Sequence, residues 1–534
     1  MNNKFNFLKI FLSFFLIVFS FYINYFYANK GLYPIDSFSF FDTGFYVTIG
    51  QHPIKDFWII SGIFVDYIQA LFFLLFGENW NSYIYHASFF NSSLALFFFF
   101  FLNQFNQRFF INFILASSAS ILCYPIIGTP FPYQHSLILS LISIFLFYLG
   151  IEKKNNVYWI LLPFFMTISF LSMQLPSGFI NILILTFSII YFLFMEKYFL
   201  KYFIFGTLFS LGMLLLYLLI VNTNLTDIIE QLILFPLSIG EGRIMSEDNA
   251  FESAKLLNKL TIRGTLGHFK FINFFILANL IVTYLYLRKK PKKFKLDKEI
   301  FLNIFIFFCA ISFILHKLIT ANQTFIFSLI PILCGLLIIQ IDKTKIFNEN
   351  NYFKILLISL VIFSTIKYHQ VYNEKRKFID LQHVNLSQAI SAKSFDPKLK
   401  ELKWITPLHY SSNPDEELKF LKEALQVIKD DQDEKMLITH YQFFSLLLKD
   451  DLNIPNRWYF PNNTFPATAQ NEYYKNYLKK FNQKLINRNI KKIYIVEAYP
   501  GEFDFLNLKD LLKPQCFKKE KLNKITIEVK LQRC

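Results

Sequence analysis

The stretch that follows the first hydrophobic segment contains carboxylates that could carry out acid–base chemistry. Asp36, Asp42 and Asp56 lie in a short polar segment of a chain that is otherwise rich in Phe, Ile and Leu. Carboxylates next to hydrocarbon cost free energy, and in membrane proteins they usually have a function. Simpler alternatives remain open, because Asp42 could cap the helix around Gly44 and Asp56 could pair with Lys55 or cap a turn.

Further polar side chains lie near the ends of hydrophobic segments, where they could contact an anionic substrate. For any one of them, hydration in a loop or snorkelling to the interface is the simpler explanation. These candidate substrate-binding residues are Tyr46, His52, Lys55, Gln134, His135, Arg243, Arg263, His316 and Lys317. The spacing assigns no cofactor, although Asp42 and Asp56 could share a divalent metal.

The composition identifies the class of protein that must position these residues. The chain is 54% hydrophobic and contains 70 Phe, far more apolar surface than a soluble domain needs. Its net charge of +16 could indicate a nucleic-acid partner. We reject that interpretation because much of the basic charge lies in loops between hydrophobic segments, where it sets membrane topology.

Hydropathy predicts eleven membrane-spanning helices. They lie near 10–29, 83–102, 109–127, 133–150, 157–173, 178–195, 203–221, 271–287, 300–316, 324–341 and 352–368. Lys and Arg occur in every second loop, whereas the short loops 128–132 and 174–177 contain none. This positive-inside pattern predicts a cytoplasmic N-terminus and a C-terminal region outside the plasma (inner) membrane.

The apolar segment 59–77 has Asp66 as its only charge and could pass for another span. If it crossed the membrane, every later basic loop would face outward. We therefore predict a helix that lies in the outer interface or dips into the membrane.

Residues 370–534 are more polar and form a region of about domain size. Short apolar runs at 402–405, 436–439 and 493–496 predict strands, and 415–429 and 473–488 have helical spacing. The sequence thus predicts a transmembrane domain at 1–369, with outer loops 30–82 and 222–270, and an outer α/β domain with a mainly parallel sheet at 370–534. In an oxidising compartment, Cys516 and Cys534 could form a disulfide, although spacing alone does not fix the pairing.

Two motifs in the first predicted outer loop resemble a known family. They are Asp42-x-Gly44-Phe45-Tyr46 and Gly50-x-x-Pro53-x-x-Asp56-Phe57-Trp58, followed by Gly62 and an apolar helix that ends in Leu75-Phe76-Gly77. This arrangement resembles the first outer loop of the GT-C membrane glycosyltransferases. It is closest to the family-39-like branch of protein mannosyltransferases and the aminoarabinose transferase of lipid A. Gln174 to Gly178 is similar to a second stretch of these enzymes, but Met173 stands where a Lys is common.

The resemblance implies transfer of a sugar from a polyprenyl-phosphate donor to an envelope lipid, glycan or protein on the outer face of the membrane. The expected mechanism is an inverting displacement with Asp42 as the base, while cations stabilise the departing lipid phosphate. Two alternatives remain open. A transporter or flippase of lipid-linked sugars should show inverted repeats, and none is clear. An O-antigen polymerase or ligase would use Arg and His in a large outer loop such as 222–270.

Overall fold

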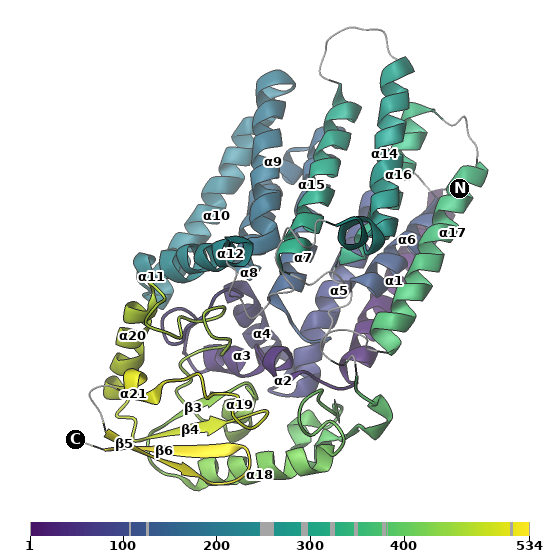
Figure 1. The fold of residues 1–534 in the computed structure, drawn as a ribbon. Coiled ribbons are helices and arrows are strands. Elements are labelled where there is room, and N and C mark those ends of the chain that lie inside the picture. The colour runs from purple at the N-terminus through teal and green to yellow at the C-terminus, as the bar shows by residue number, and fades with distance from the viewer. Residues whose placement is uncertain are drawn as a thin grey trace.

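The computed structural model describes residues 2–105, 108–123, 128–245, 261–289, 297–320, 326–346, 351–375, 381, 383–512 and 516–532. Within these ranges, the side chains of 2–6, 242–245 and 263–264 are not described. The chain is a bundle of long helices with a mixed α/β region packed against one end (Figure 1).

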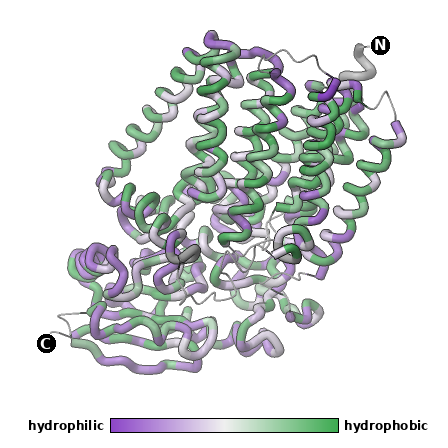
Figure 2. The backbone as a smooth tube through the Cα atoms, turned by 45° about the horizontal axis from the view of Figure 1, so that its top comes forward, coloured by the Kyte–Doolittle hydropathy of each residue, from purple (hydrophilic) through white to green (hydrophobic). Residues whose placement is uncertain are grey.

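Eight helices in the described part of the chain are long and apolar enough to cross a membrane. They are α1 (Asn2–Ala28), α5 (Trp80–Asn103), α7 (Pro132–Lys153), α9 (Gln174–Phe194), α10 (Leu200–Val221), α14 (Lys270–Lys289), α15 (Lys298–Thr320) and α17 (Asn351–Tyr368). Figure 2 shows that hydrophobic residues dominate this bundle, whereas the C-terminal region alternates between polar and apolar residues. The prediction of a polytopic helical membrane protein is therefore confirmed at this level.

Three further helices occupy predicted spans but are shorter. They are α6 (Phe109–Leu122), α8 (Asn156–Ser172) and α16 (Leu329–Thr344), with 14, 17 and 16 residues. At about 1.5 Å per residue, 14 residues cover only about 21 Å of a hydrocarbon layer that is about 30 Å thick. The count of eleven spans and the orientation of the chain in the membrane therefore stay predictions.

The loop between α1 and α5 folds into three short helices, α2 (Pro34–Ser37), α3 (Phe41–Thr48) and α4 (Ile63–Phe76). The last of these covers the segment that we expect not to cross the membrane. It has 14 residues and is flanked by Gly62 and Gly77, both with positive φ, which end the helix on either side. The chain then turns directly into α5.

After α10 the chain continues as α11 (Leu225–Ile229), a π-helical turn η2 (Glu230–Leu234) and α12 (Phe235–Met245). These three elements form one continuous helical rod. It runs crosswise to the long apolar helices, at the end of the bundle that faces the C-terminal region (Figure 1). A second π-helical turn, η4 (Arg263–Gly267), precedes α14, and η6 (His369–Glu374) extends α17.

The C-terminal region contains a four-stranded sheet in the order β3-β4-β6-β5. Strands β3 (Lys435–Thr439) and β4 (Lys492–Val496) are parallel, whereas β6 (Thr526–Gln532) pairs antiparallel with both β4 and β5 (Cys516–Lys521). The expectation of a mainly parallel sheet is therefore wrong, because β5 and β6 form a hairpin that adds two antiparallel pairs. The accompanying helices are α18 (Pro414–Asp430), α19 (Phe444–Leu448), α20 (Tyr474–Asn487) and α21 (Leu508–Leu511).

The predicted strand at 402–405 lies outside this sheet. Its central residues form β2 (Lys403–Trp404), which pairs antiparallel with β1 (Ile390–Ser391). At the other end of the region, Cys516 is disulfide-bonded. The partner that we expect for it, Cys534, lies outside the described residues.

The first loop and the C-terminal region share one hydrophobic core. Phe38 packs against Trp404 and Phe443, with ring centroids 6.0 Å and 4.9 Å apart. Single β-bridges join Lys30 to Lys403 and Trp58 to Asn456. The C-terminal region is thus fixed to the same end of the bundle as the first loop, whereas the chain's N-terminus lies at the opposite end (Figure 1).

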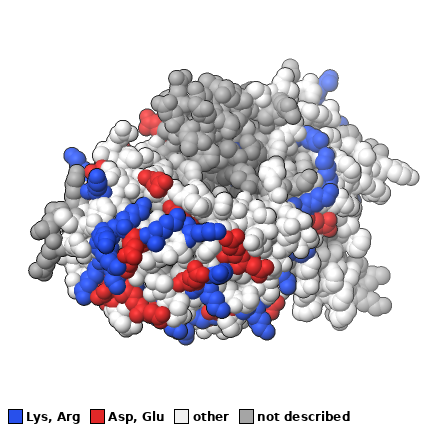
Figure 3. Space-filling model, turned by 60° about the horizontal axis from the view of Figure 1, so that its bottom comes forward, with Lys and Arg blue, Asp and Glu red and all other residues white. Residues whose placement is uncertain are grey.

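The outer surface of the C-terminal region carries both signs of charge, close together (Figure 3). Lys492 pairs with Asp431 at 2.7 Å, and Lys530 pairs with Glu528 at 3.0 Å. Such interspersed charges are typical of a hydrated surface. On the face shown, basic side chains alternate with acidic ones.

Candidate functional site

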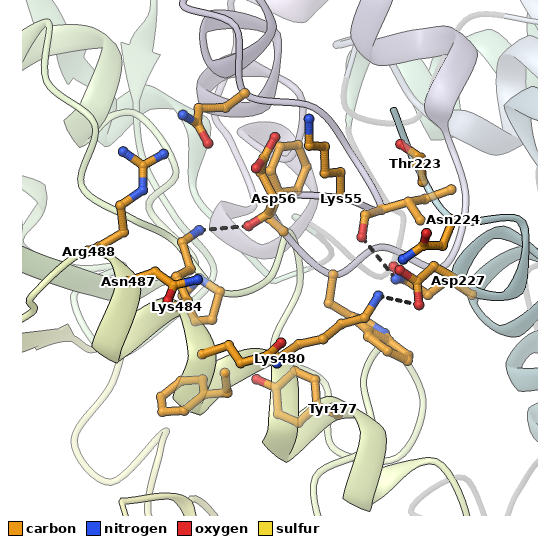
Figure 4. A pocket seen from close by; sticks show the side chains of 18 of the residues that line it. Lys55, Asp56, Thr223, Asn224, Asp227, Tyr477, Lys480, Lys484, Asn487 and Arg488 are labelled. Atoms are coloured by element: carbon orange, nitrogen blue, oxygen red, sulfur yellow. Dashed lines mark hydrogen bonds and ion pairs between the residues drawn. The ribbon is translucent and has the colours of Figure 1, made fainter. Parts of the chain in front are cut away.

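A cavity of about 360 Å³ lies where the first loop, the start of α11 and helix α20 meet (Figure 4). Asn222, the residue that ends α10, is one of its lining residues, so the cavity lies at the end of a helix that is long and apolar enough to cross a membrane. Four cationic side chains and two carboxylates contribute to its lining, so its charge is net positive. They are Lys55, Lys480, Lys484 and Arg488, with Asp56 and Asp227.

One wall of the cavity is the tight turn that contains Asp56. Ile54 has a φ of +74°, which is strained for a β-branched residue. Hydrogen bonds hold it there, because Ile54 N donates to Phe57 O at 3.1 Å and Ile54 O accepts from Gln231 Nε2 at 3.2 Å. Strain of this kind concentrates at functional sites.

The same turn orients the carboxylate of Asp56. Its Oδ2 atom accepts a hydrogen bond from His52 N at 2.7 Å, and Oδ1 has no hydrogen-bond donor among the described residues. The side chain is partly exposed and lines the cavity. Asp56 can therefore accept a proton from a molecule bound there.

The opposite wall is one face of α20. Lys480, Lys484 and Arg488 recur every four residues, a spacing that places them on the same side of a helix. Lys480 Nζ lies 2.9 Å from Asp227 Oδ1. Lys484 Nζ donates to the backbone carbonyls of Asp56 and Ile454, each at 2.7 Å. This lysine ties α20 to the turn of the first loop.

Burial makes the ammonium group of Lys484 easier to deprotonate. It lowers the pKa of the ammonium to about 8, against the opposing effect of Asp451 and Asp56. The side chain is therefore mostly protonated at neutral pH and loses its charge in mildly alkaline solution. An anion bound in the cavity would raise this pKa again.

Buried polar atoms of Trp58 and Thr223 at the cavity have no partner among the residues that the structure describes. Neither Trp58 Nε1 nor Thr223 Oγ1 makes a hydrogen bond to any described residue, and both residues line the cavity. Trp58 is only 4% exposed, with its ring held edge-on by Phe235 and Tyr477. Since buried polar groups are normally hydrogen-bonded, these atoms are available to a polar ligand.

Asp42 lies elsewhere, in the interface between the first loop and the C-terminal region. Its carboxylate is fully buried and accepts hydrogen bonds from the backbone N–H groups of Leu446 at 2.9 Å and Ser445 at 3.2 Å. Burial raises its pKa to about 7, although these hydrogen bonds and Lys398 oppose the rise. Asp42 is not among the residues that line the cavity, and its hydrogen bonds hold the first loop to the C-terminal region.

Tyr46 has the same surroundings as Asp42. Its hydroxyl lies 2.9 Å from Ser445 Oγ, and the side chain is 1% exposed. The sequence pattern Asp42-x-Gly44-Phe45-Tyr46 therefore contributes to attachment of the C-terminal region. Gly44 is needed for packing in α3, because a Cβ there would lie 2.5 Å from Gln69 Cγ.

Asp66 forms a second, fully buried link between the two parts. It pairs with Arg457 and accepts a hydrogen bond from Thr43 Oγ1 at 2.7 Å. Arg457 also donates to Ser61 O and lies over the ring of Phe40, 4.3 Å from its centroid. Burial raises the pKa of Asp66 to about 6, against the effect of Arg457. Asp66 is thus an internal ion-pair partner rather than a group that faces water.

The other predicted binding residues do not line this cavity. His52 Nδ1 lies 2.9 Å from the hydroxyl of Tyr67, just outside it. Among the helices, Gln134 donates to Cys123, His135 lies 2.9 Å from His86, and Lys317 lies over Tyr133, which stacks on His316. The side chains of Arg243 and Arg263 lie outside the described residues.

The sequence identified Lys55 and Asp56, which line the cavity, but not the basic residues of the opposite wall. The four-residue spacing of Lys480, Lys484 and Arg488 could have identified a basic helix face. In the described part of the chain, no group of three His, Cys, Asp or Glu side chains could hold a metal ion. No protein-family model matches the chain, and no curated protein matches it.

Proposed function

We propose that this protein is a membrane glycosyltransferase that moves a sugar from a polyprenyl-phosphate donor to an envelope lipid, glycan or protein. The observation that carries this proposal is the cavity at the end of α10, where cationic side chains face the carboxylate of Asp56, whose Oδ1 atom accepts no hydrogen bond from the described residues. A lipid-linked phosphate lies at the membrane surface, and the position of the cavity beside the end of the apolar helix α10 supports the same level for it. The proposed reaction takes place there.

The phosphate of the donor binds the cationic side of the cavity. Lys480 and Lys55 can form charge-assisted hydrogen bonds to phosphate oxygens, and Lys484 adds a buried positive charge. As the sugar leaves, negative charge grows on the phosphate, and fixed cations stabilise it most in that state. Trp58 Nε1 and Thr223 Oγ1, which make no hydrogen bond within the described parts of the chain, can donate to sugar hydroxyls or to the phosphate.

The acceptor hydroxyl attacks the anomeric carbon while the bond from that carbon to the phosphate oxygen breaks. Asp56 takes the hydroxyl proton, and the polyprenyl phosphate leaves as the anion. A single displacement of this kind inverts the anomeric configuration. We assign the base to Asp56 rather than to Asp42, because Asp56 lines the cavity and Asp42 is bound to backbone amides.

The proposal is tested in a deletion strain by mass spectrometry of its envelope glycans and lipid-linked sugars. Wild-type protein should restore one sugar, and Asp56→Asn at matched expression should lower transfer by about 10²- to 10⁴-fold, with accumulation of the donor. Asp430→Asn, an exposed carboxylate on α18, is the matched control and should be fully active.

Three outcomes would contradict parts of this proposal. Full activity of Asp56→Asn would remove Asp56 as the base. If Asp42→Asn were inactive although folded in normal amounts, the base would be Asp42. A deletion strain with unchanged glycans and a blocked movement of lipid-linked sugar would replace transfer with transport.

Phosphate binding can be measured separately from sugar transfer. Binding of farnesyl phosphate to purified protein in nanodiscs should weaken about tenfold or more in Lys480→Gln, since a hydrogen bond to a charged group contributes about 1.5–3 kcal/mol. Lys479→Gln is the control, because Lys479 is exposed and does not line the cavity. Equal binding by both variants would show that the phosphate does not contact this face of α20.

A further inference from the structure

The helical rod that follows α10 has two different faces. Glu230, Gln231, Leu232 and Phe235 are buried. Large apolar side chains on the rest of the rod are exposed, at intervals close to one helical turn. They are Leu225, Ile229, Ile233, Leu234 and Leu237, with exposed fractions between 37% and 64%.

The buried face is fixed to the first loop and to the C-terminal region. Gln231 accepts a hydrogen bond from Ile59 N at 3.0 Å and donates to Ile54 O at 3.2 Å. Asn476 of α20 donates to the carboxylate of Glu230 at 3.3 Å. Glu230 and Gln231 are therefore directed toward protein, on the side of the rod opposite its exposed apolar residues.

The exposed apolar face continues the lipid-facing surface of α10. Leu219 and Ile220, in the last turn of that helix, are 78% and 72% exposed. After the turn at Asn222, Leu225 is 59% exposed, so the apolar surface passes from one helix to the next. The rod starts where α10 ends and runs crosswise to it (Figure 1). This geometry favours a position for its apolar face at the edge of the hydrocarbon layer.

We propose that the segment from Leu225 to Leu237 lies in the plane of the membrane interface, with lipid acyl chains against its exposed apolar face. In-plane helices of this kind bury one apolar face at the boundary of headgroups and acyl chains. Lipid is the occupant because the face is continuous with the surface of a membrane-spanning helix.

The position of this helix has a consequence for the cavity. Asn224, Asp227 and Gln231 line the cavity from the opposite face of the same rod. A single helix thus separates the acyl chains from the polar site. Its π-helical turn η2 contains Gln231, and such turns are frequent at functional sites.

Spin labels measure this position directly and independently of any enzymatic activity. Single Cys substitutions at Ile233 and Leu237 are labelled, and the protein is placed in nanodiscs of phosphatidylcholine and phosphatidylglycerol. Leu219 on α10 is the lipid-facing reference. Val427 on α18, which is 38% exposed, is the water-facing control with an exposure close to the 40% of Ile233.

Labels at Ile233 and Leu237 should behave like the label at Leu219, with greater collision by oxygen than by a water-soluble nickel chelate. If they collide with the chelate as often as the label at Val427, the proposal is overturned. Immobile labels protected from both reagents would indicate a protein partner on this face and would also overturn it.

Wild-type protein provides a second measurement that needs no substitution. A photoactivatable phospholipid in the same nanodiscs should label peptides from 225–237 together with those from the end of α10. Labelling of α10 without any labelling of 225–237 would contradict the proposal. Both measurements report position in the membrane, so they remain decisive whether or not the protein transfers a sugar.

Discussion

Replacement of Arg457 by Met should loosen the C-terminal region from the first loop. The substitution keeps an apolar side chain of similar length but leaves the buried carboxylate of Asp66 without its cation. Both side chains of the pair are 0% exposed. Breaking a fully buried pair by removing one partner costs about 3–5 kcal/mol, because an uncompensated charge remains inside.

The stability lost in Arg457→Met should depend on pH. With Arg457 present, the pKa of Asp66 is about 6, and removal of the cation raises it further. When the pKa of a carboxyl group is higher in the folded than in the unfolded state, the protein becomes less stable as the pH rises from about 4 to the folded pKa. In wild-type protein this loss ends near pH 6, whereas in the variant it continues to higher pH. The difference in stability between Arg457→Met and wild-type protein should therefore be larger at pH 7.5 than at pH 5.5.

Hydrogen exchange at the interface provides the assay. Trp58 N donates to Pro455 O at 2.8 Å, and Arg457 N donates to Trp58 O at 3.1 Å, so both amides report opening of the interface. A loss of 3–5 kcal/mol corresponds to exchange that is on the order of 10²- to 10⁴-fold faster. Arg488→Met is the control, since that side chain is 43% exposed.

Two results would refute this reasoning. If Arg457→Met exchanges no faster than Arg488→Met, the ion pair does not hold the interface. If the acceleration is the same at pH 5.5 and pH 7.5, the cost does not come from the charge of Asp66. The double variant Arg457→Met with Asp66→Asn should recover part of the loss, because it removes the unpaired charge.

Two other predictions concern the same interface. Gly62→Ala should lower stability by about 1–3 kcal/mol, because φ is +91° and a Cβ would lie 2.7 Å from the Phe40 ring. Gly212→Ala, which lies inside α10 with no described atom within 4 Å of the added Cβ, should not lower stability in thermal unfolding. Burial of Asp42, with a pKa of about 7, should make wild-type stability fall by up to about 4 kcal/mol between pH 4 and pH 7. In Asp42→Asn this pH dependence should be smaller, and an unchanged pH profile would contradict the assignment.

The long apolar helices could be predicted because their cause is local. Eight long apolar helices coincide with predicted spans, since each run of about 20 apolar residues specifies a helix without reference to the rest of the chain. The same holds for the helices at 415–429 and 473–488, which the structure shows as α18 and α20. The β5–β6 hairpin was missed because its strands lie in a stretch rich in lysine.

The contacts of the carboxylates could not be predicted, because their partners are distant in the sequence. Asp66 pairs with Arg457, 391 residues away, and Asp42 accepts from Leu446, 404 residues away. A single sequence contains no signal for such pairs. Asp56 was singled out for its place beside Trp58 in a motif, but the basic face of α20 opposite it follows only from the fold.

The links between the first loop and the C-terminal region also impose an order on biosynthesis. Asp42 leaves the ribosome about 400 residues before Leu446, the residue whose amide it accepts from. At about 5–20 residues per second, the first loop waits roughly 20 to 80 seconds for its partner. Throughout that interval the groups that later become buried must stay hydrated. A chain that lacks its last hundred residues cannot form this interface and should present the exposed loop to cellular quality control.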